Sequence, residues 1–195
     1  MKKQPIHIVW FKRDLRIVDN EALFHAHQSD LPLLLIYVFE PSVMNYDDSD
    51  VRHWRFIYES IQDLNKKLQP FNSKIYFFHD EVKNVFSELI QNFEVKSVFS
   101  HQEIGNKVTY DRDLEMKAFF DSNDITWNEF QMHGVIRKLK SRQDWDKRWE
   151  QVMRDTPKII RESDLKTIKL DPDFYYQIKG AELSTEITTD RKSVV

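Results

Sequence analysis

Cysteine is absent from the 195-residue sequence, and glycine occurs only three times. Without cysteine the chain has no disulfide framework, no thiolate nucleophile and no cysteine-ligated metal, which excludes zinc fingers and iron–sulfur sites and favours a reducing compartment. Neither the dinucleotide-binding motif G-x-G-x-x-G nor the phosphate-binding motif G-x-x-x-x-G-K-[ST] occurs. The two common phosphate-gripping loops are therefore excluded.

The sequence also lacks a large charge of one sign and a long apolar run. Its 29 Lys and Arg residues against 32 Asp and Glu residues leave a net charge of -3, which does not indicate a nucleic-acid or membrane-surface binder. The longest apolar run, Leu31–Phe39, includes Pro32 and is too short to cross a bilayer, and the N-terminus has no apolar segment typical of a secretion signal. We therefore expect a cytoplasmic protein that makes no membrane contact.

Short apolar segments alternate with amphipathic ones between Ile6 and Glu129. Segments rich in β-branched and aromatic residues predict five strands: Ile6–Phe11, Leu31–Phe39, Lys74–His79, Val95–His101 and Ile125–Glu129. Apolar residues at helical spacing predict four helices between them: Glu21–His27, Trp54–Leu68, Val82–Phe93 and Tyr110–Phe119. This alternation predicts an α/β fold, a doubly wound, Rossmann-like, five-stranded parallel sheet with helices on both faces.

The pattern changes after Gln131. Between Arg137 and Arg161 nine basic residues stand against four acidic ones, while Trp145, Trp149 and Val152 recur at near-helical spacing. We expect a basic helix whose tryptophans pack against the α/β body or a further domain; a solvated helix and a DNA-contacting helix are the alternatives. From Ser163 on, a polar run with few helix or strand signals predicts a linker. The predicted division is an α/β domain over residues 1–133, and a basic helical segment and linker over residues 134–195.

Polar and aromatic side chains follow the predicted strands where each strand ends. Ligands of doubly wound sheets bind at this edge, outside the carboxyl ends of the strands. We expect one cleft there, lined by Phe11, Lys12, Asp14, Phe39, Glu40, Arg52, Arg55, Glu103 and Asn106. Its carboxylates, guanidinium groups and amides are suited to orienting a planar polar ligand such as a pterin or flavin ring. Singly, these groups also fit structural roles, such as pairing of Asp14 with Arg16, helix capping by Asp19, or binding of backbone amides by Glu103.

No catalytic or metal-binding constellation is visible in the sequence. His25 and His27 are two residues apart and would point to different faces of a helix, and the other histidines have no partner at a ligand spacing. Neither the nucleophile motif G-x-S-x-G nor the zinc motif H-E-x-x-H occurs. We therefore assign no catalytic residue and no bound metal to this chain.

The loop after the first predicted strand carries a specific resemblance. The string Val9–Arg16, followed by Asp19–Leu23, closely resembles the opening signature of the DNA photolyase/cryptochrome family. The similarity continues through Tyr37–Pro41 and Trp54–Phe56, and through Glu103 and the pair Arg112 and Asp113, so that it covers residues 6 to about 155. The block Gly134–Lys140 with Trp145–Trp149 is similar to one branch of photolyase-like proteins. The stretch Ile104–Asp111 departs from the family by being longer than in several relatives.

The resemblance implies that two domains have separate functions. Family members join an N-terminal α/β domain, which in many of them holds an antenna chromophore (a folate, a deazaflavin or a flavin), to a larger helical domain that binds FAD and, in photolyases, docks damaged DNA. Only the first part matches this sequence, so we expect this chain to bind no FAD and to be inactive alone, while the full-length protein is a deoxyribodipyrimidine photo-lyase. The resemblance also implies that Glu103 accepts hydrogen bonds from the antenna ring.

Three functions remain open at this point. The first is the antenna domain of a light-dependent DNA-repair flavoprotein, which would hold a pigment at a fixed distance and orientation from FAD. The second is a domain of a non-repair cryptochrome blue-light receptor, which would serve as a scaffold for the helical FAD domain without a pigment of its own. The third, a nucleotide-binding α/β enzyme, is disfavoured because no phosphate-gripping loop is present.

Overall fold

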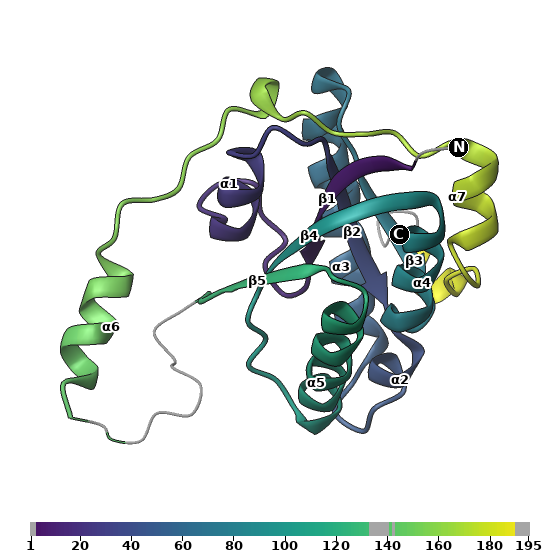
Figure 1. The fold of residues 1–195 in the computed structure, drawn as a ribbon. Helices are drawn as coiled ribbons and strands as arrows, with labels where there is room; N and C mark the ends of the chain where they lie inside the picture. The colour runs from purple at the N-terminus through teal and green to yellow at the C-terminus, as the bar shows by residue number, and fades with distance from the viewer. Residues whose placement is uncertain (1–2, 133–140, 142, 190–195) are drawn as a thin grey trace.

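Five parallel strands form one sheet at the centre of the structure, a computed structural model that describes residues 3–132, 141 and 143–189 (Figure 1). They are β1 (Gln4–Phe11), β2 (Leu33–Phe39), β3 (Ile75–His79), β4 (Phe93–His101) and β5 (Thr126–Phe130). The strand order is β3-β2-β1-β4-β5, and each neighbouring pair is parallel. The predicted doubly wound, five-stranded parallel sheet is confirmed, and its order reverses between β1 and β4.

Helices precede, follow and connect these strands. They are α1 (Glu21–His27), α2 (Pro41–Met44), α3 (Val51–Leu68), α4 (Val82–Asn92), α5 (Lys107–Ser122), α6 (Trp145–Met153), α7 (Pro172–Ile178) and α8 (Thr185–Thr188), with 3-10 turns η1 (Gln69–Phe71) and η2 (Glu162–Asp164). The four helices predicted between strands are present. Helix α3 begins before Trp54 because the Asp50 carboxylate accepts a hydrogen bond from the Arg52 N–H and caps the helix there. Asn20 caps α1 in the same way.

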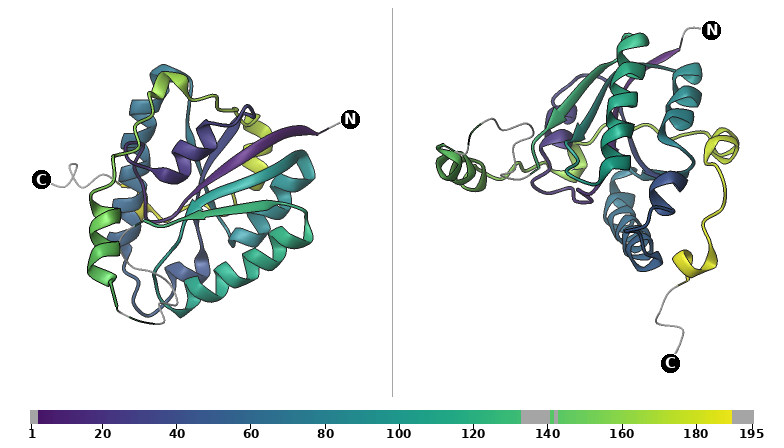
Figure 2. Two further views of the ribbon diagram at one scale, coloured as in Figure 1. Left: turned by 60° about the vertical axis from the view of Figure 1, so that its left-hand side comes forward. Right: turned by 90° about the horizontal axis from the view of Figure 1, so that it is seen from below.

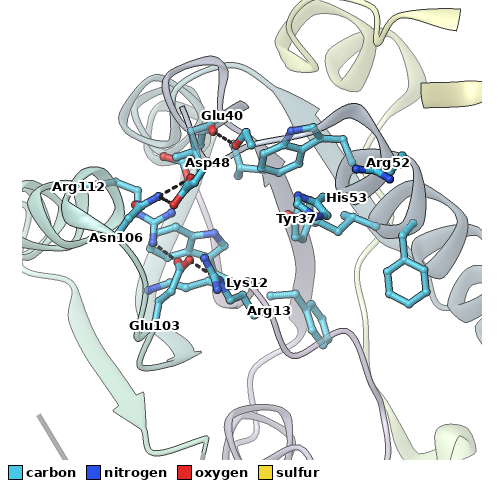
Figure 3. A pocket seen from close by; sticks show the side chains of 18 residues that line it. Lys12, Arg13, Tyr37, Glu40, Asp48, Arg52, His53, Glu103, Asn106 and Arg112 are labelled. Carbon is cyan, nitrogen blue, oxygen red and sulfur yellow. Dashed lines mark hydrogen bonds and ion pairs between the residues drawn. The ribbon is translucent and has the colours of Figure 1, made fainter. Parts of the chain in front are cut away.

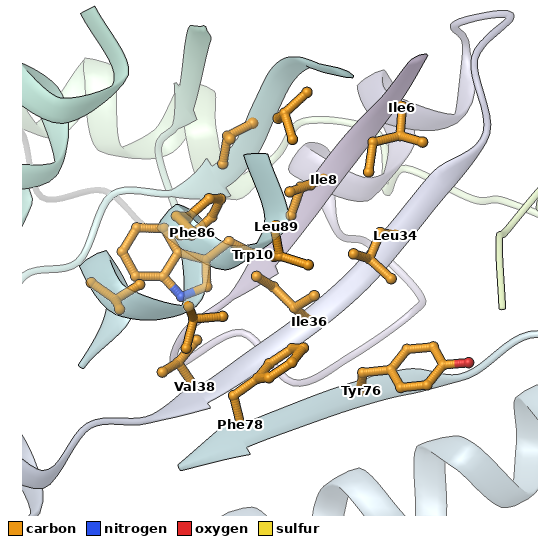
Figure 4. Packing of buried hydrophobic residues seen from close by; sticks show 14 of the residues in the cluster. Ile6, Ile8, Trp10, Leu34, Ile36, Val38, Tyr76, Phe78, Phe86 and Leu89 are labelled. Atoms are coloured by element: carbon orange, nitrogen blue, oxygen red, sulfur yellow. The ribbon is translucent and has the colours of Figure 1, made fainter. Parts of the chain in front are cut away.

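The sheet buries apolar side chains on both faces. On one face Ile8, Trp10 and Ile36 pack against α4 and α5 (Figure 4). On the other face Val9 and Phe11 belong to a second cluster, which includes residues of α1 and α3. Alternate residues of β1 therefore enter opposite clusters, as the period-2 geometry of a strand requires. The two views of Figure 2 show helices on both sides of the sheet.

The C-terminal residues 158–188, here called the C-terminal strap, differ from the sequence prediction. The run from Ser163 on, in which the sequence shows few helix or strand signals, contains the short helices α7 and α8. Its apolar residues Leu170, Ile178, Leu183 and Ile187 are buried in the two clusters of the sheet. They are too widely spaced to produce a helical or strand period in the sequence, so only their contacts with distant residues reveal them.

The strap also closes the outer edge of strand β3. The His79 N–H donates a hydrogen bond to the Lys179 carbonyl (2.7 Å), and the Ala181 N–H donates one to the His79 carbonyl (3.1 Å). Between them Gly180 pairs with His79 as a parallel bridge. An edge strand exposes unpaired N–H and C=O groups to other chains, and here the strap pairs those of His79.

Helix α6 confirms the predicted helix within Arg137–Arg161 and lies apart from the sheet in Figures 1 and 2. Trp145 and Trp149 are 40% and 41% exposed, and their rings contact each other with centroids 6.4 Å apart. The expectation that these tryptophans pack against the α/β body is wrong, and packing against a further domain stays a prediction. The block Gly134–Lys140 and the predicted boundary between residues 133 and 134 lie outside the described residues.

Candidate functional site

A cavity of about 540 Å³ opens at the carboxyl ends of β1, β2 and β4, beside α3 (Figure 3). It is lined by Trp10, Phe11, Lys12, Arg13, Tyr37, Val38, Glu40, Val43, Asp48, Ser49, Arg52, His53, Trp54, Phe56, Ile57, Glu103, Asn106 and Arg112. Strands β1 and β4 are the two between which the strand order reverses, so the cavity lies at the topological switch point, where ligands of open α/β sheets bind. Its volume is within the range of small-molecule sites.

The structure brings most of the predicted cleft residues together. Six of them line the cavity: Phe11, Lys12, Glu40, Arg52, Glu103 and Asn106. They come from the ends of β1, β2 and β4 and from the start of α3, as the parallel sheet predicts. The other three, Asp14, Phe39 and Arg55, do not line it. Whether the six bind a ligand stays a prediction.

Asp14 lies behind the cavity and fixes the loop that carries Lys12. Its buried carboxylate accepts hydrogen bonds from the Lys12 backbone N–H (2.8 Å), from Asn20 Nδ2 (3.1 Å) and from His101 Nδ1 (2.5 Å). Burial opposes ionisation, but the hydrogen bond and electrostatic attraction of His101 hold the pKa of Asp14 below its ordinary value. The side-chain pair with Arg16, which the sequence left open, is replaced by this bond to His101.

Phe39 and Arg55 support helix α3 rather than the cavity itself. Phe39 is fully buried and packs edge-to-face against the ring of Trp54, with centroids 6.3 Å apart. Arg55 extends toward the C-terminal strap, where its Nε donates a hydrogen bond to the Glu186 carbonyl (2.7 Å). Both residues therefore hold the wall of the cavity from behind.

Arg112 of α5 organises the charged side of the cavity. Its guanidinium donates to Glu40 Oε1 (2.5 Å), to Glu103 Oε2 (2.6 Å) and to Asp113 Oδ1 (2.9 Å). Arg13 binds the remaining oxygen of Glu103, with Nε 2.9 Å from Oε1. Burial alone would lower the pKa of Arg112, but the three carboxylates raise it above its ordinary value, so this group stays charged. Both oxygens of Glu103 thus contact arginine.

Lys12 is a buried cation beside two stacked indole rings. Its ammonium lies 3.0 Å from Asp113 Oδ1, 4.3 Å from the centre of the Trp10 ring and 5.0 Å from that of Trp127. Burial lowers the pKa of Lys12, and the charge of Asp113 opposes that shift. The two tryptophans are themselves stacked, with ring centres 6.0 Å apart. A flat indole surface fixed by cations therefore forms part of the cavity wall.

Glu40 differs from the other carboxylates of the cavity. Burial raises its pKa from 4.5 to about 7, although the charge of Arg112 lowers it in part. Its Oε2 atom is buried and has no hydrogen-bond partner among the residues that the structure describes. A buried carboxylate oxygen without a partner is unfavourable in a folded protein.

The opposite side of the cavity belongs to α3 and is more open. Figure 3 shows Arg52 and His53 across from Glu103 and Arg112. Phe56 is 71% exposed at this rim. Arg52 is paired with Asp50 at 2.8 Å and remains largely exposed, so it can also meet an anionic group of a ligand. Across the rim, Asn106 donates to the two oxygens of Asp48 (3.0 and 3.1 Å).

Sequence reasoning missed several cavity residues, of which Arg112 is the most important. The pair Arg112 and Asp113 entered only through the family resemblance and not as part of the site. One signal was available: Asp113 follows Thr109 by four residues and precedes Met116 by three, so it falls in the buried stripe of α5. A charged residue in such a stripe indicates a buried ion pair. Trp54 and His53 gave no comparable signal.

No group of three or more His, Asp or Glu side chains within residues 3–132, 141 and 143–189 is placed to hold a metal ion. Over the same residues, no helix has both the length and the apolar character needed to cross a membrane.

Known proteins show the same fold. An archaeal photolyase from Sulfolobus tokodaii, solved with two FAD molecules, superposes with a TM-score of 0.67 at 18% identity, covering 90% of this chain and 42% of that one. A class III photolyase from Agrobacterium tumefaciens gives a TM-score of 0.68 at 18% identity, covering 88% of this chain and 37% of that one. These identities support the fold alone.

Sequence comparison adds membership of a family. A blue-light photoreceptor of Arabidopsis thaliana is 30% identical over 104 residues, which cover 51% of this chain and 23% of that protein. Cryptochrome-2 of Gallus gallus is 31% identical over 86 residues, covering 44% of this chain and 15% of that protein. The chain thus spans less than a quarter of these curated relatives. The DNA photolyase family model matches residues 7–161. Cryptochromes are among the relatives of this chain. The chain therefore belongs to the DNA photolyase family.

Proposed function

We propose that this chain is the antenna-chromophore domain of a photolyase-like flavoprotein, and that its cavity holds a planar pigment. The observation that carries the proposal is the cavity at the switch point, with aromatic walls and a charged side formed by Glu40, Glu103 and Arg112. A folate, a deazaflavin or a flavin ring has the flat faces and polar edge that such a cavity fits. The pigment would supply light absorption, and the chain would supply a fixed position.

Rigid placement is the property that this role demands. Energy transfer to a second pigment depends on distance and orientation, so the host needs a wall that does not move rather than an acid or a base. The network of Arg112 with Glu40 and Glu103, and the contact of the Lys12 ammonium with the Trp10 ring, support such a wall. The more open rim with Arg52 leaves room for an anionic tail.

The proposal also covers the role of this chain within the full-length protein. We infer that residues 1–133 form the pigment-holding domain, and that residues 134–195 lead toward a helical domain that binds FAD and docks damaged DNA. Light-dependent repair of pyrimidine dimers would then belong to the full-length protein, with this chain inactive alone. Membership of the DNA photolyase family supports this proposal.

Pigment binding can be tested on the 195-residue chain itself. Riboflavin, flavin mononucleotide and 5-formyltetrahydrofolate are titrated separately into the chain, and binding is followed by pigment fluorescence and by equilibrium dialysis. We expect saturable binding of one pigment per chain. For a flavin, Arg52→Ala should weaken the phosphorylated form more than riboflavin, whereas Arg154→Ala on α6 should change neither. Glu103→Ala should lower pigment occupancy.

The outcomes separate the possible functions. If none of the three pigments binds the folded chain, the antenna role is refuted and the scaffold role in a blue-light receptor becomes the better account. Stoichiometric FAD in the purified chain would refute the assignment of FAD to a separate helical domain.

A further inference from the structure

The C-terminal strap is bonded to two walls of the cavity without entering it. One wall is lined by Lys12 and Arg13, from the loop between β1 and α1, and another by residues of α3. None of the strap residues 158–188 lines the cavity. One end of the strap nevertheless binds that loop, and the other end binds α3 (Figure 1).

The first anchor is at Lys158, where the strap begins. The Asp19 N–H donates a hydrogen bond to the Lys158 carbonyl (2.8 Å), and the Lys158 N–H donates one to Asp19 Oδ1 (3.1 Å). Asp19 has a φ of +53°, a left-handed conformation that is unfavourable for most residues, so these two bonds help to fix it. Asn20 donates to Asp14 Oδ2, and Asp14 Oδ1 accepts the Lys12 N–H. The anchor is thereby linked to the cavity wall.

The second anchor is in α8, near the other end of the strap. The Arg55 guanidinium donates to the Glu186 carbonyl from both Nε (2.7 Å) and Nη2. Ile187, next to Glu186, is 4% exposed and belongs to the same apolar cluster as buried residues of α3. Arg55 directly follows Trp54, which lines the cavity. This end of the strap therefore holds the first turns of α3.

The strap has too few contacts to dock in independent pieces. Helices α7 and α8 have seven and four residues, fewer than an isolated helix needs to persist in water, so both depend on docking. Ordering each residue of the strap costs backbone entropy, which the burial of apolar side chains must offset. These side chains are thinly spread along it: Ile160, Leu165, Leu170, Ile178, Leu183 and Ile187. Loss of one anchor therefore weakens the docking of the whole segment.

We propose that the strap docks on the sheet as one unit, and that its docking holds the loop after β1 and the start of α3 in place. A partner that draws the strap away loosens both walls of the cavity. A ligand that stiffens both walls favours the docked strap, because such coupling is reciprocal. The coupling does not depend on which ligand the cavity takes, so it stands apart from the proposed function.

Hydrogen exchange of single amides, followed by NMR on the 195-residue chain, tests this coupling without a ligand. The Ile168 N–H donates to the Leu33 carbonyl (2.9 Å) and reports on the part of the strap nearer the first anchor. The Ala181 N–H donates to the His79 carbonyl (3.1 Å) and reports on the part nearer the second. The Lys12 N–H reports on the cavity wall, and amides in the middle of α5 monitor global unfolding.

Removal of the second anchor should be felt at the first. We expect Arg55→Ala to speed exchange about fivefold at Ala181, the effect of about one lost hydrogen bond, and by a similar factor at Ile168 and Lys12. Lys169→Ala is the matched control. Lys169 is an exposed strap residue whose side chain has no hydrogen bond within the described part of the chain, and its variant should behave as wild type.

Removal of the first anchor should be felt at the second. Asp19→Ala deletes the acceptor of the Lys158 N–H and places alanine in a left-handed conformation, so we expect exchange at Ala181 to become about tenfold faster. Asp19→Asn keeps a side-chain oxygen and tolerates that conformation, and it should restore exchange close to the wild-type rate.

The range of each effect decides the outcome. If Arg55→Ala speeds exchange only at Ala181, and Asp19→Ala only at Ile168 and Lys12, the two anchors act independently and the proposal is overturned. If Arg55→Ala destabilises the fold so far that α5 exchanges equally fast, Arg55→Lys, which keeps one donor, is judged by the same criterion. Faster exchange at the distant anchor in both series, with α5 unchanged, supports the coupling.

Discussion

Gly180 is the residue on which closure of the β3 edge depends. Its φ of +79° lies in the left-handed region, and a Cβ added there would stand 2.1 Å from the His79 carbonyl oxygen. That oxygen belongs to the backbone of β3 and accepts the Ala181 N–H, so it cannot move aside without loss of the bridge. Alanine at this position is therefore unfavourable for two reasons: it must adopt a left-handed backbone conformation, and its Cβ collides with the backbone of β3.

The size of the effect follows from these contacts. A non-glycine residue in the left-handed region costs roughly 1–2 kcal/mol. Loss of the two backbone hydrogen bonds between His79 and the strap adds about 1 kcal/mol each. We therefore expect Gly180→Ala to lower the free energy of unfolding by about 3–4 kcal/mol, or to release the strap at a similar cost.

Urea denaturation and hydrogen exchange distinguish these two results. Release of the strap would remove protection from the Ala181 amide and speed tryptic cleavage after Lys179 while the sheet stays folded. Gly105→Ala is the comparison variant: its φ is outside the left-handed region and its Cβ would meet the side-chain hydroxyl of Thr109 (2.5 Å) rather than backbone, so we expect a smaller loss of stability than for Gly180→Ala. Equal stability and equal amide protection in Gly180→Ala and wild type would refute the reasoning.

Three further predictions concern buried charges. Because the pKa of Glu40 is raised to about 7, the folded chain loses stability as pH rises from about 4.5 to above 7, and Glu40→Gln should remove up to about 3 kcal/mol of that loss. Asp113→Asn leaves Lys12 buried without its nearest carboxylate and should cost about 3 kcal/mol in urea denaturation. The lowered pKa of Asp14 stabilises the fold above pH about 4, so Asp14→Asn, which weakens the bond to His101, should flatten the loss of stability in acid.

Exposed carboxylates provide the controls for these measurements. Asp121 is 62% exposed and pairs with Lys117 within α5, so Asp121→Asn should change stability by less than about 0.5 kcal/mol. A pH profile of Glu40→Gln that is parallel to that of wild type would contradict the assigned pKa. Wild-type stability in Asp113→Asn would mean that Lys12 is not held by this carboxylate.

The parallel sheet and the position of the cavity at its carboxyl edge could be predicted because local sequence patterns mark each strand and its end. A short apolar run followed by charged residues marks the end of a buried parallel strand, and β1, β2 and β4 each end in this way. Because the strands are parallel, their carboxyl ends lie at the same edge of the sheet, independently of the length and conformation of the loops. Lys12, Glu40 and Glu103 therefore meet in space although they are far apart in sequence.

The parts that could not be predicted depend on distant contacts. Nothing near Arg112 in the sequence shows that it reaches Glu40, which lies 72 residues away. Phe39 continues an apolar strand, yet its neighbour Trp54 contributes to the cavity wall because α3 packs across the strand end. Each of these side chains takes its role from the packing of α3 or α5 on the sheet, which local periodicity does not specify.

The strap and the cavity are coupled through one helix. Helix α3 contributes Arg52 and Trp54 to the cavity, and on its other side it packs against α8. Arg55, which directly follows Trp54 in sequence, is held by the carbonyl of Glu186, a residue 131 positions later. None of the strap residues lines the cavity, yet the strap restrains the helix that forms its open wall. The C-terminal residues therefore help to set the geometry of the site formed by the first 112 residues.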